Sequence, residues 1–161
     1  MLPTNRSTAF SRMRQLQIKF IKDPEYGRLY KEQIDCLEEK EFIEQVTQKT
    51  ETGEIIHYLP HRGIDKKESL TTSLRIVMDG SSKQNASTCS LNDVLYTGPK
   101  IGTDLVKCTV RMRCGRFAAT SDLEKAFLKL LIRTKDRDAL RFFSLKIFMI
   151  WIAKWKYIDI G

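Results

Sequence analysis

The sequence predicts an α+β domain in which helices come first and strands follow, with further helices between the strands. Two observations carry this prediction. Up to residue 50, apolar side chains recur at spacings of three and four, and beyond it short apolar runs alternate with stretches rich in glycine, proline and serine. With 161 residues and 42% hydrophobic content, the chain fits one compact domain or the front part of a larger one.

Two helices are expected at the start of the chain. Ser7 can cap the first, and Asp23 followed by a proline at the first helical position begins the second. Their predicted apolar stripes comprise Phe10, Met13, Leu16, Phe20 and Ile21, and then Tyr26, Leu29, Tyr30, Ile34 and Leu37. These stripes predict that the two helices pack against each other.

A strand, a loop and a returning strand are expected next. The strand runs from Glu54 to Leu59 and is ended by Pro60. Residues 61 to 73 lack apolar periodicity and hold Gly63, two lysines and a Ser/Thr cluster, which predicts an exposed loop. Leu74 to Met78 is the returning strand.

Four further elements are predicted after residue 100. Thr103 to Arg113 has helical spacing and is closed by Gly115. Phe117 to Thr120 predicts a short buried strand, Leu123 to Leu131 a helix or turn, and Ala139 to Phe143 a final strand.

The net charge of +8 is unevenly distributed along the chain. Residues 101 to 161 hold thirteen basic and six acidic side chains, an excess of +7, whereas residues 36 to 60 carry −4. A solvated basic face is one explanation. A polyanionic partner is the other, and nucleic acid is the natural candidate.

Cysteine usage predicts an intracellular protein, in the cytoplasm or nucleus. The four cysteines form no Cys-x-x-Cys pair and have no histidine nearby, which argues against zinc. Without an evident secretory leader, reduced thiols are expected. The longest apolar run, Ile147 to Ala153, falls far short of the roughly 20 residues that a membrane span requires, so no membrane association is expected.

The segment 120–127 carries the most informative pattern. It places one carboxylate, Asp122, between an apolar strand-like run and an aromatic residue. A strand end can hold Asp122 against a divalent cation, the Leu123 carbonyl can add an oxygen ligand, and the following turn can present Ala126 and Phe127 to a sugar and its phosphates. The alternative is that Asp122 caps the helix that follows it.

Several short motifs precede Asp122 in one fixed order. They are Leu2-Pro3-Thr4-Asn5-Arg6, Asp23-Pro24-Glu25, His57-Tyr58-Leu59-Pro60-His61, Lys66-Lys67, Leu74-Arg75-Ile76-Val77-Met78-Asp79, Ser90-Leu91-Asn92-Asp93-Val94-Leu95 and Gly98-Pro99-Lys100. Together the series resembles a reverse transcriptase, and more narrowly the polymerase region of the Pao/BEL class of LTR retrotransposons. The resemblance spans roughly residues 1 to 143.

The resemblance implies the fingers and the start of the palm of a right-hand polymerase. Asp122 would then be the first catalytic carboxylate and would bind Mg²⁺ or Mn²⁺ together with the Leu123 carbonyl. Phe127, next to Ala126, would be the aromatic steric gate that lies under the incoming sugar. Without the family context, a core aromatic remains the alternative reading of Phe127.

The resemblance also implies roles for residues of the fingers. Arg75 matches an arginine that contacts triphosphate oxygens, and Lys66 or Lys67 matches a neighbouring lysine. Asp79 and Asn92 match positions that shape the template path. The implied partners are an RNA or DNA template-primer and deoxynucleoside triphosphates. Arg75 as a solvent-facing strand residue and Asp79 as a turn anchor remain alternatives.

Two other groups of side chains stand out. His57 and His61 belong to the resembling motif and have no evident nucleophile beside them, so they are expected to be structural or to contact template. The basic cluster at the end of one predicted helix has a solvated face as its simplest explanation and template-backbone binding as its second. It comprises Lys107, Arg111, Arg113 and Arg116.

The same resemblance suggests three parts: a helical lead-in segment at residues 1–50, fingers and partial palm at 54–143, and a divergent tail at 144–161. The family completes its metal site from an aromatic-x-Asp-Asp hairpin, and Tyr157 to Ile160 offers only one acid. We therefore expect the chain alone to be inactive. The alternative is a non-enzymatic, nucleic-acid-binding relic. Ile147 to Ile152 is expected to fold back as a helix or strand, or to be poorly ordered.

Overall fold

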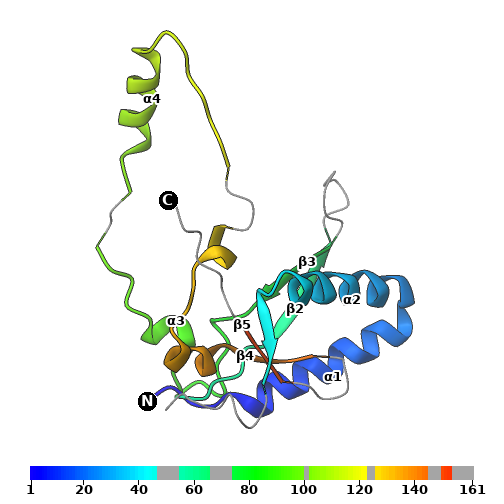
Figure 1. The fold of residues 1–161 in the computed structure, drawn as a ribbon. Coiled ribbons are helices and arrows are strands. Elements are labelled where there is room, and N and C mark those ends of the chain that lie inside the picture. The colour runs from blue at the N-terminus through cyan, green and yellow to red at the C-terminus, as the bar shows by residue number, and fades with distance from the viewer. Residues whose placement is uncertain (47–54, 66–73, 100–101, 123–125, 145–149, 154–161) are drawn as a thin grey trace.

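The computed structural model describes residues 1–46, 55–65, 74–99, 102–122, 126–144 and 150–153, the last of these for their backbone alone (Figure 1). It is a mixed α+β structure with an N-terminal helical pair, a small antiparallel two-stranded sheet and further short helices. The α+β class expected from the sequence is thereby confirmed. No helix among the described residues has both the length and the apolar character to cross a membrane.

The helical pair consists of α1 (Arg6–Lys22) and α2 (Pro24–Glu39), which lie side by side (Figure 1). The predicted start of α2 is confirmed, because the Asp23 side chain accepts a hydrogen bond from the Tyr26 backbone amide at 3.0 Å. The expected Ser7 cap of α1 is wrong. Asn5 occupies the cap position in the left-handed region, and its buried amide donates to the carbonyl of Tyr58 at 3.2 Å instead of capping the helix.

The core lies between the helical pair and the strands. The predicted stripes supply five of its eleven buried apolar side chains, and the main cluster comprises Ala9, Met13, Leu16, Tyr26, Tyr30, Ile34, Ile43, Tyr58, Leu74, Phe142 and Phe143. Ile21 was expected in the stripe but is 80% exposed. Phe20 takes the core side of that last turn, with ring centroids 5.7 Å from Tyr26 and 5.2 Å from Tyr30.

The two-stranded sheet pairs β2 (His61–Asp65) with β3 (Leu74–Met78) in antiparallel fashion. The returning strand is therefore confirmed, but the first strand follows Pro60 instead of ending there. Among residues 55–60 only Tyr58 forms a bridge, with Arg141. Proline lacks an amide hydrogen and suits the position before a strand, and its carbonyl accepts from the Asp79 amide at 2.8 Å.

The second sheet has three antiparallel strands in the order β1-β5-β4. They are β1 (Ile43–Gln45), β5 (Ile150–Ala153) and β4 (Arg141–Phe143). The expectation that the tail folds back as a strand is confirmed for β5. The other residues of that tail, apart from Ser144, lie outside the described ranges.

The rest of the described chain holds short helices: α3 (Leu91–Val94), α4 (Leu105–Arg113), and two 3-10 helices, η2 (Ala126–Lys129) and η3 (Thr134–Leu140). Asp104 caps α4. The helix ends at Arg113 with Cys114 in a right-handed helical conformation, so Gly115 does not close it as predicted. The expected final strand is shorter than predicted, because Leu140 belongs to η3.

The strand expected at residues 117–120 does not form, and all four residues are exposed. A lone strand gains neither ladder hydrogen bonds nor a packed face, and the described residues provide no strand beside this one. Of the helix or turn expected for residues 123–131, the described part from residue 126 onward holds the single 3-10 turn η2.

Candidate nucleotide and nucleic-acid site

The β2–β3 hairpin buries one face and exposes the other. Its register pairs Ile64 with Arg75 and Arg62 with Val77, so these four side chains share one face. Arg62 and Arg75 are exposed on that face, whereas Leu74 on the opposite face is 1% exposed. Two guanidinium groups therefore lie on one surface. Sequence reasoning predicted Arg75 and missed Arg62, because strand alternation was not recognised in residues 61–65.

Arg75 lies near the end of the hairpin at which the connecting segment begins. Its neighbour Leu74 pairs with Asp65, which directly precedes Lys66 and Lys67 in the chain. Both lysines lie outside the described residues, so their assignment to the triphosphate stays a prediction. The side chain of Arg75 makes no hydrogen bond or ion pair with any residue that the structure describes. Its guanidinium is therefore available to a phosphate.

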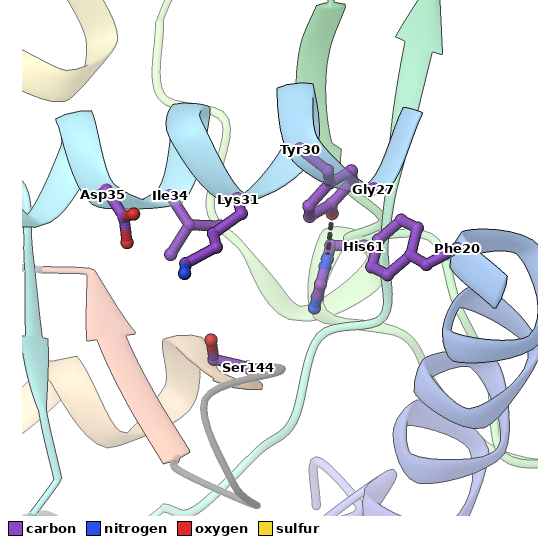
Figure 2. A pocket seen from close by; sticks show the side chains of 8 residues that line it. All are labelled: Phe20, Gly27, Tyr30, Lys31, Ile34, Asp35, His61 and Ser144. Carbon is purple, nitrogen blue, oxygen red and sulfur yellow. Dashed lines mark hydrogen bonds between the residues drawn. The ribbon is translucent and has the colours of Figure 1, made fainter. Parts of the chain in front are cut away.

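His61 belongs to the interior of the fold. Its Nε2 lies 2.6 Å from the carbonyl oxygen of Phe143, and its Nδ1 contacts the hydroxyl of Tyr30 (Figure 2). A carbonyl oxygen only accepts, so Nε2 carries the hydrogen and Nδ1 accepts from Tyr30. Burial lowers the pKa of His61, and the hydrogen bond to Phe143 offsets this only in part. His61 therefore links α2, β2 and β4 as a neutral structural residue.

A pocket of about 390 Å³ lies beside this histidine, between α2 and the end of β4 (Figure 2). Lys31, Ile34 and Asp35 on α2 face Ser144 across it. Acid-base chemistry by His61 would need a free ring nitrogen, and both of its ring nitrogens are engaged. His61 therefore does not make this pocket a catalytic centre.

His57 is also structural, which was one of its two expected roles. It is completely buried, and its Nδ1 donates to the carbonyl of Pro3 at 2.6 Å. Its backbone carbonyl accepts from the Arg141 amide at 3.1 Å, and the Leu59 amide donates to the Arg141 carbonyl at 2.7 Å. His57 thus fixes the segment before β2 against β4 and the N-terminus.

Arg141 and Asp138 form a buried ion pair that the sequence did not indicate. The Arg141 side chain is 2% exposed, and its Nη2 lies 2.8 Å from Oδ1 of Asp138. Nη1 lies 3.4 Å from the hydroxyl of Tyr58. Burial acts to lower the pKa of Arg141, but its hydrogen bonds to Tyr58 and Asp138 outweigh this and raise it. Through Tyr58, the pair ties the start of β4 to the segment before β2.

Asp79 and Asn92 meet at the turn that follows β3. Oδ1 of Asp79 accepts from the amide of Ser81 at 3.1 Å and from its hydroxyl at 2.6 Å. The Asn92 amide donates to the Gly80 carbonyl at 3.0 Å. A Cβ on Gly80 would lie 2.6 Å from Oδ1 of Asn92, so a larger residue at this position would have to displace the Asn92 side chain. Asp79 therefore anchors a turn, and a template contact by either residue stays a prediction.

The structure describes three of the four residues expected to bind the nucleotide's metal and sugar, and all three are exposed. Asp122 is exposed and in no regular element, so it does not end a strand as expected. Leu123 lies outside the described residues, and so does the first turn of the helix that Asp122 would cap in the alternative reading. Ala126 and Phe127 begin η2, and Phe127 is 78% exposed, which makes the core-aromatic alternative wrong within the described structure.

No group of three metal-ligating side chains comes together among the described residues. Asp122 alone therefore does not provide the several oxygens that two Mg²⁺ or Mn²⁺ ions need. The expected cofactor stays a prediction for a polymerase that supplies further carboxylates.

The basic cluster on and after α4 is fully accessible. Lys107, Arg111, Arg113 and Arg116 are exposed, and α4 buries none of its residues. Figure 1 shows α4 at the far end of a long excursion of the chain away from the other helices and strands. A solvated face and a backbone-binding surface are both compatible with this position.

The comparisons with known proteins leave the family open. No family model matches the chain, and neither a curated protein nor a solved structure matches it. Any functional conclusion therefore rests on the ordered motifs and on the geometry of the hairpin.

Proposed function

We propose that this chain is the fingers and the start of the palm of a Pao/BEL-type reverse transcriptase, whose complete polymerase carries out metal-dependent nucleotidyl transfer. One observation carries the proposal. The β2–β3 hairpin exposes Arg75 on one face, close to the connecting segment that contains Lys66 and Lys67. This arrangement suits the role that the resemblance implies for Arg75 and for one of the two lysines, which is to hold the triphosphate of an incoming nucleotide.

The chemistry of the hairpin supports the same function. A guanidinium group binds two phosphate oxygens at once, and an ammonium group adds a point charge. Because β2 and β3 are paired over five residue pairs, backbone hydrogen bonds fix the position of Arg75 on β3. The hairpin thus provides a rigid cationic support for a polyphosphate.

Asp122 is the residue that must carry the chemistry if the proposal is correct. Phosphoryl transfer with two metal ions would require several carboxylates to hold the ions. One of the ions would activate the attacking primer hydroxyl. The family's aromatic-x-Asp-Asp segment is not among the 161 residues. The proposal is therefore tested on the product of the whole open reading frame that contains this chain.

The test measures primer extension on an RNA template with deoxynucleoside triphosphates and Mg²⁺. Replacing Asp122 with Asn should abolish extension, by at least about a thousandfold. Asp104→Asn is the matched control, because Asp104 is also exposed and Asn caps a helix as well as Asp does. Primer extension that survives Asp122→Asn would refute the assignment. So would a product of the whole open reading frame that has no polymerase activity.

The second candidate function is nucleic-acid binding without catalysis by a relic of such a polymerase. The excess of +7 in residues 101–161 and the exposed α4 cluster favour it. Under this alternative the extended protein binds template-primer but does not extend it, and Asp122→Asn changes neither result.

A further inference from the structure

We infer that a second cationic groove, between α1 and the β2–β3 hairpin, binds the phosphodiester backbone of a single nucleic-acid strand. The groove has a volume of about 450 Å³. Its cations come from two elements, Arg12 and Lys19 from α1 and Arg62 from β2. This α1–hairpin groove does not include Asp122, Arg75 or α4. This inference deepens the proposed function. It rests on that function only in taking nucleic acid as the polyanion that the groove binds.

All the charged side chains of α1 are positive. The helix holds five basic residues and no acidic residue. Arg12 and Lys19 lie seven residues apart, which is two helical turns or about 10 Å along the axis. They therefore lie on the same side of α1, and the groove runs between them. A stretch of this length is longer than one phosphate group, so it fits a chain of phosphates better than a single anion.

The cations of the groove are available to a ligand. Arg12 and Arg62 are exposed, and neither side chain makes a hydrogen bond or ion pair within the part of the chain that the structure describes. Lys19 is held in place, because its ammonium group lies 3.4 Å from the ring centroid of Tyr26. Tyr26 in turn donates from its hydroxyl to the Gly63 carbonyl at 3.1 Å, which ties α2 to β2.

Among the described residues, one carboxylate lines the groove beside three cations, and it forms no ion pair with them. It belongs to Asp79, and one of its oxygens accepts two hydrogen bonds from Ser81. The floor is partly apolar, with Leu16, Val77 and Met78. A basic rim above an apolar floor suits a strand whose phosphates meet the rim while sugars or bases lie on the floor.

The face of the hairpin extends this surface. Arg62 and Arg75 point to the same side of the sheet, and the pairs Arg62–Val77 and Ile64–Arg75 follow each other along it. Cations thus continue from the groove toward the end of the hairpin. A long polyanion can contact both Arg62 and the groove cations of α1, because the three cations come from two elements that line the same groove.

The test measures binding of a fluorescently labelled 20-nucleotide single strand by anisotropy at several salt concentrations, with the whole 161-residue protein. The double variant Arg12→Gln, Arg62→Gln removes two groove charges. We expect its affinity to fall about tenfold and its salt slope to decrease by about 1.4 logarithmic units, which is about 0.7 for each phosphate that is no longer neutralised.

The matched control is the double variant Arg14→Gln, Lys22→Gln. Both residues are exposed on α1 and do not line the groove, so the net charge changes equally. The control should keep most of the wild-type affinity and slope. Equal losses in the two variants would overturn the inference, because they would show general electrostatic attraction. Unfolding of either variant is checked by circular dichroism, and Arg12→Lys provides a milder change.

A competition experiment separates the sources of the polyanion. Polyglutamate at matched charge should displace the strand from the wild-type protein far less well than unlabelled single strand does. Equal displacement would make an acidic peptide the partner and overturn the inference. A failure of primer extension counts against the proposed function alone, while equal losses in the two double variants count against the groove alone.

Discussion

Apolar side chains are buried in the body of the molecule and exposed in its projecting segment. In the body, formed by α1, α2, β2, β3 and β4, Tyr30, Leu74 and Phe142 are at most 1% exposed. In the projecting segment, residues 102–122, Leu105 is 80% and Phe117 is 91% exposed. Figure 1 shows the first packed in layers and the second extending away. The difference teaches that apolar content alone does not bury a segment, which also needs a second element to pack against.

The two regions divide the proposed site between them. The positions assigned to phosphate binding lie on the packed body, on the hairpin and beside α1. Those assigned to metal and sugar, Asp122 and Phe127, lie on or next to the projecting segment. In the proposed polymerase, a palm sheet would give this segment its partners. The following predictions test how strongly the two regions differ.

The largest expected difference is in amide hydrogen exchange. Backbone amides of α2 should exchange at least about a thousandfold more slowly than those of α4, because α2 is anchored in the core and α4 buries no residue. A nine-residue helix without packing partners is marginal in water. Exchange is followed by mass spectrometry after proteolysis. Equal protection of the two helices would contradict the comparison, since it would mean that α4 is packed in solution.

The buried ion pair should give the largest effect of a single substitution. Asp138→Asn removes the negative charge 2.8 Å from the buried guanidinium of Arg141, and the free energy of unfolding should fall by about 3–5 kcal/mol. The exposed pair of Arg133 and Asp136 has the same sequence spacing, so Asp136→Asn is the matched control and should cost less than about 1 kcal/mol. Urea denaturation measures both. Similar losses would mean that the Asp138 pair is solvated.

The hydrogen bond between Tyr30 and His61 should have an intermediate effect. Tyr30→Phe keeps the packing but leaves Nδ1 of His61 buried without its donor, which should cost about 1–3 kcal/mol. Tyr96, which is 91% exposed, provides the control, because Tyr96→Phe should leave the urea midpoint unchanged. If Tyr30→Phe left the free energy of unfolding unchanged, this would show that water reaches His61.

The smallest expected effect is a pH dependence of stability. Burial holds the pKa of His61 below its ordinary value of 6.5, so the unfolded chain binds a proton at this position more readily than the folded one. Stability from this residue is therefore complete above about pH 6.5 and falls as the pH decreases, by at most about 1.4 kcal/mol per pH unit. Urea unfolding between pH 7.5 and 5 checks this. In His61→Asn the slope should flatten, and an unchanged slope would assign it to another group.

Local signals in the sequence predicted the elements that depend on local interactions. Asp23 and Pro24 define the start of α2 because a cap and a fixed φ act within one turn. Leu74 to Met78 was recognised as a strand from its apolar run. In contrast, β2 was missed because His61 and Gly63 are its inward residues, and its pairing depends on β3.

Other features depend on contacts that no local pattern reveals. Asn5 takes the cap position of α1 because its amide reaches Tyr58, 53 residues away. The ion pair of Asp138 and Arg141 is buried, and Arg141 contacts Tyr58, 83 residues away in the chain. The strand expected before Asp122 needs a neighbouring strand, and its sequence alone does not provide one. The hairpin part of the candidate site was therefore predictable in outline, whereas Arg62 and the α1–hairpin groove required the three-dimensional structure.

The central claim is that residues 122–127 belong to the nucleotide site of a polymerase, and sugar selection tests it most directly. The measurement compares incorporation of ribonucleotides and deoxyribonucleotides by the product of the open reading frame that contains this chain. If Phe127 is the steric gate, Phe127→Val should raise the relative use of ribonucleotides by at least about tenfold, while Phe117→Val, at a similarly exposed aromatic, should not. Unchanged selectivity in an active Phe127→Val enzyme would contradict the claim.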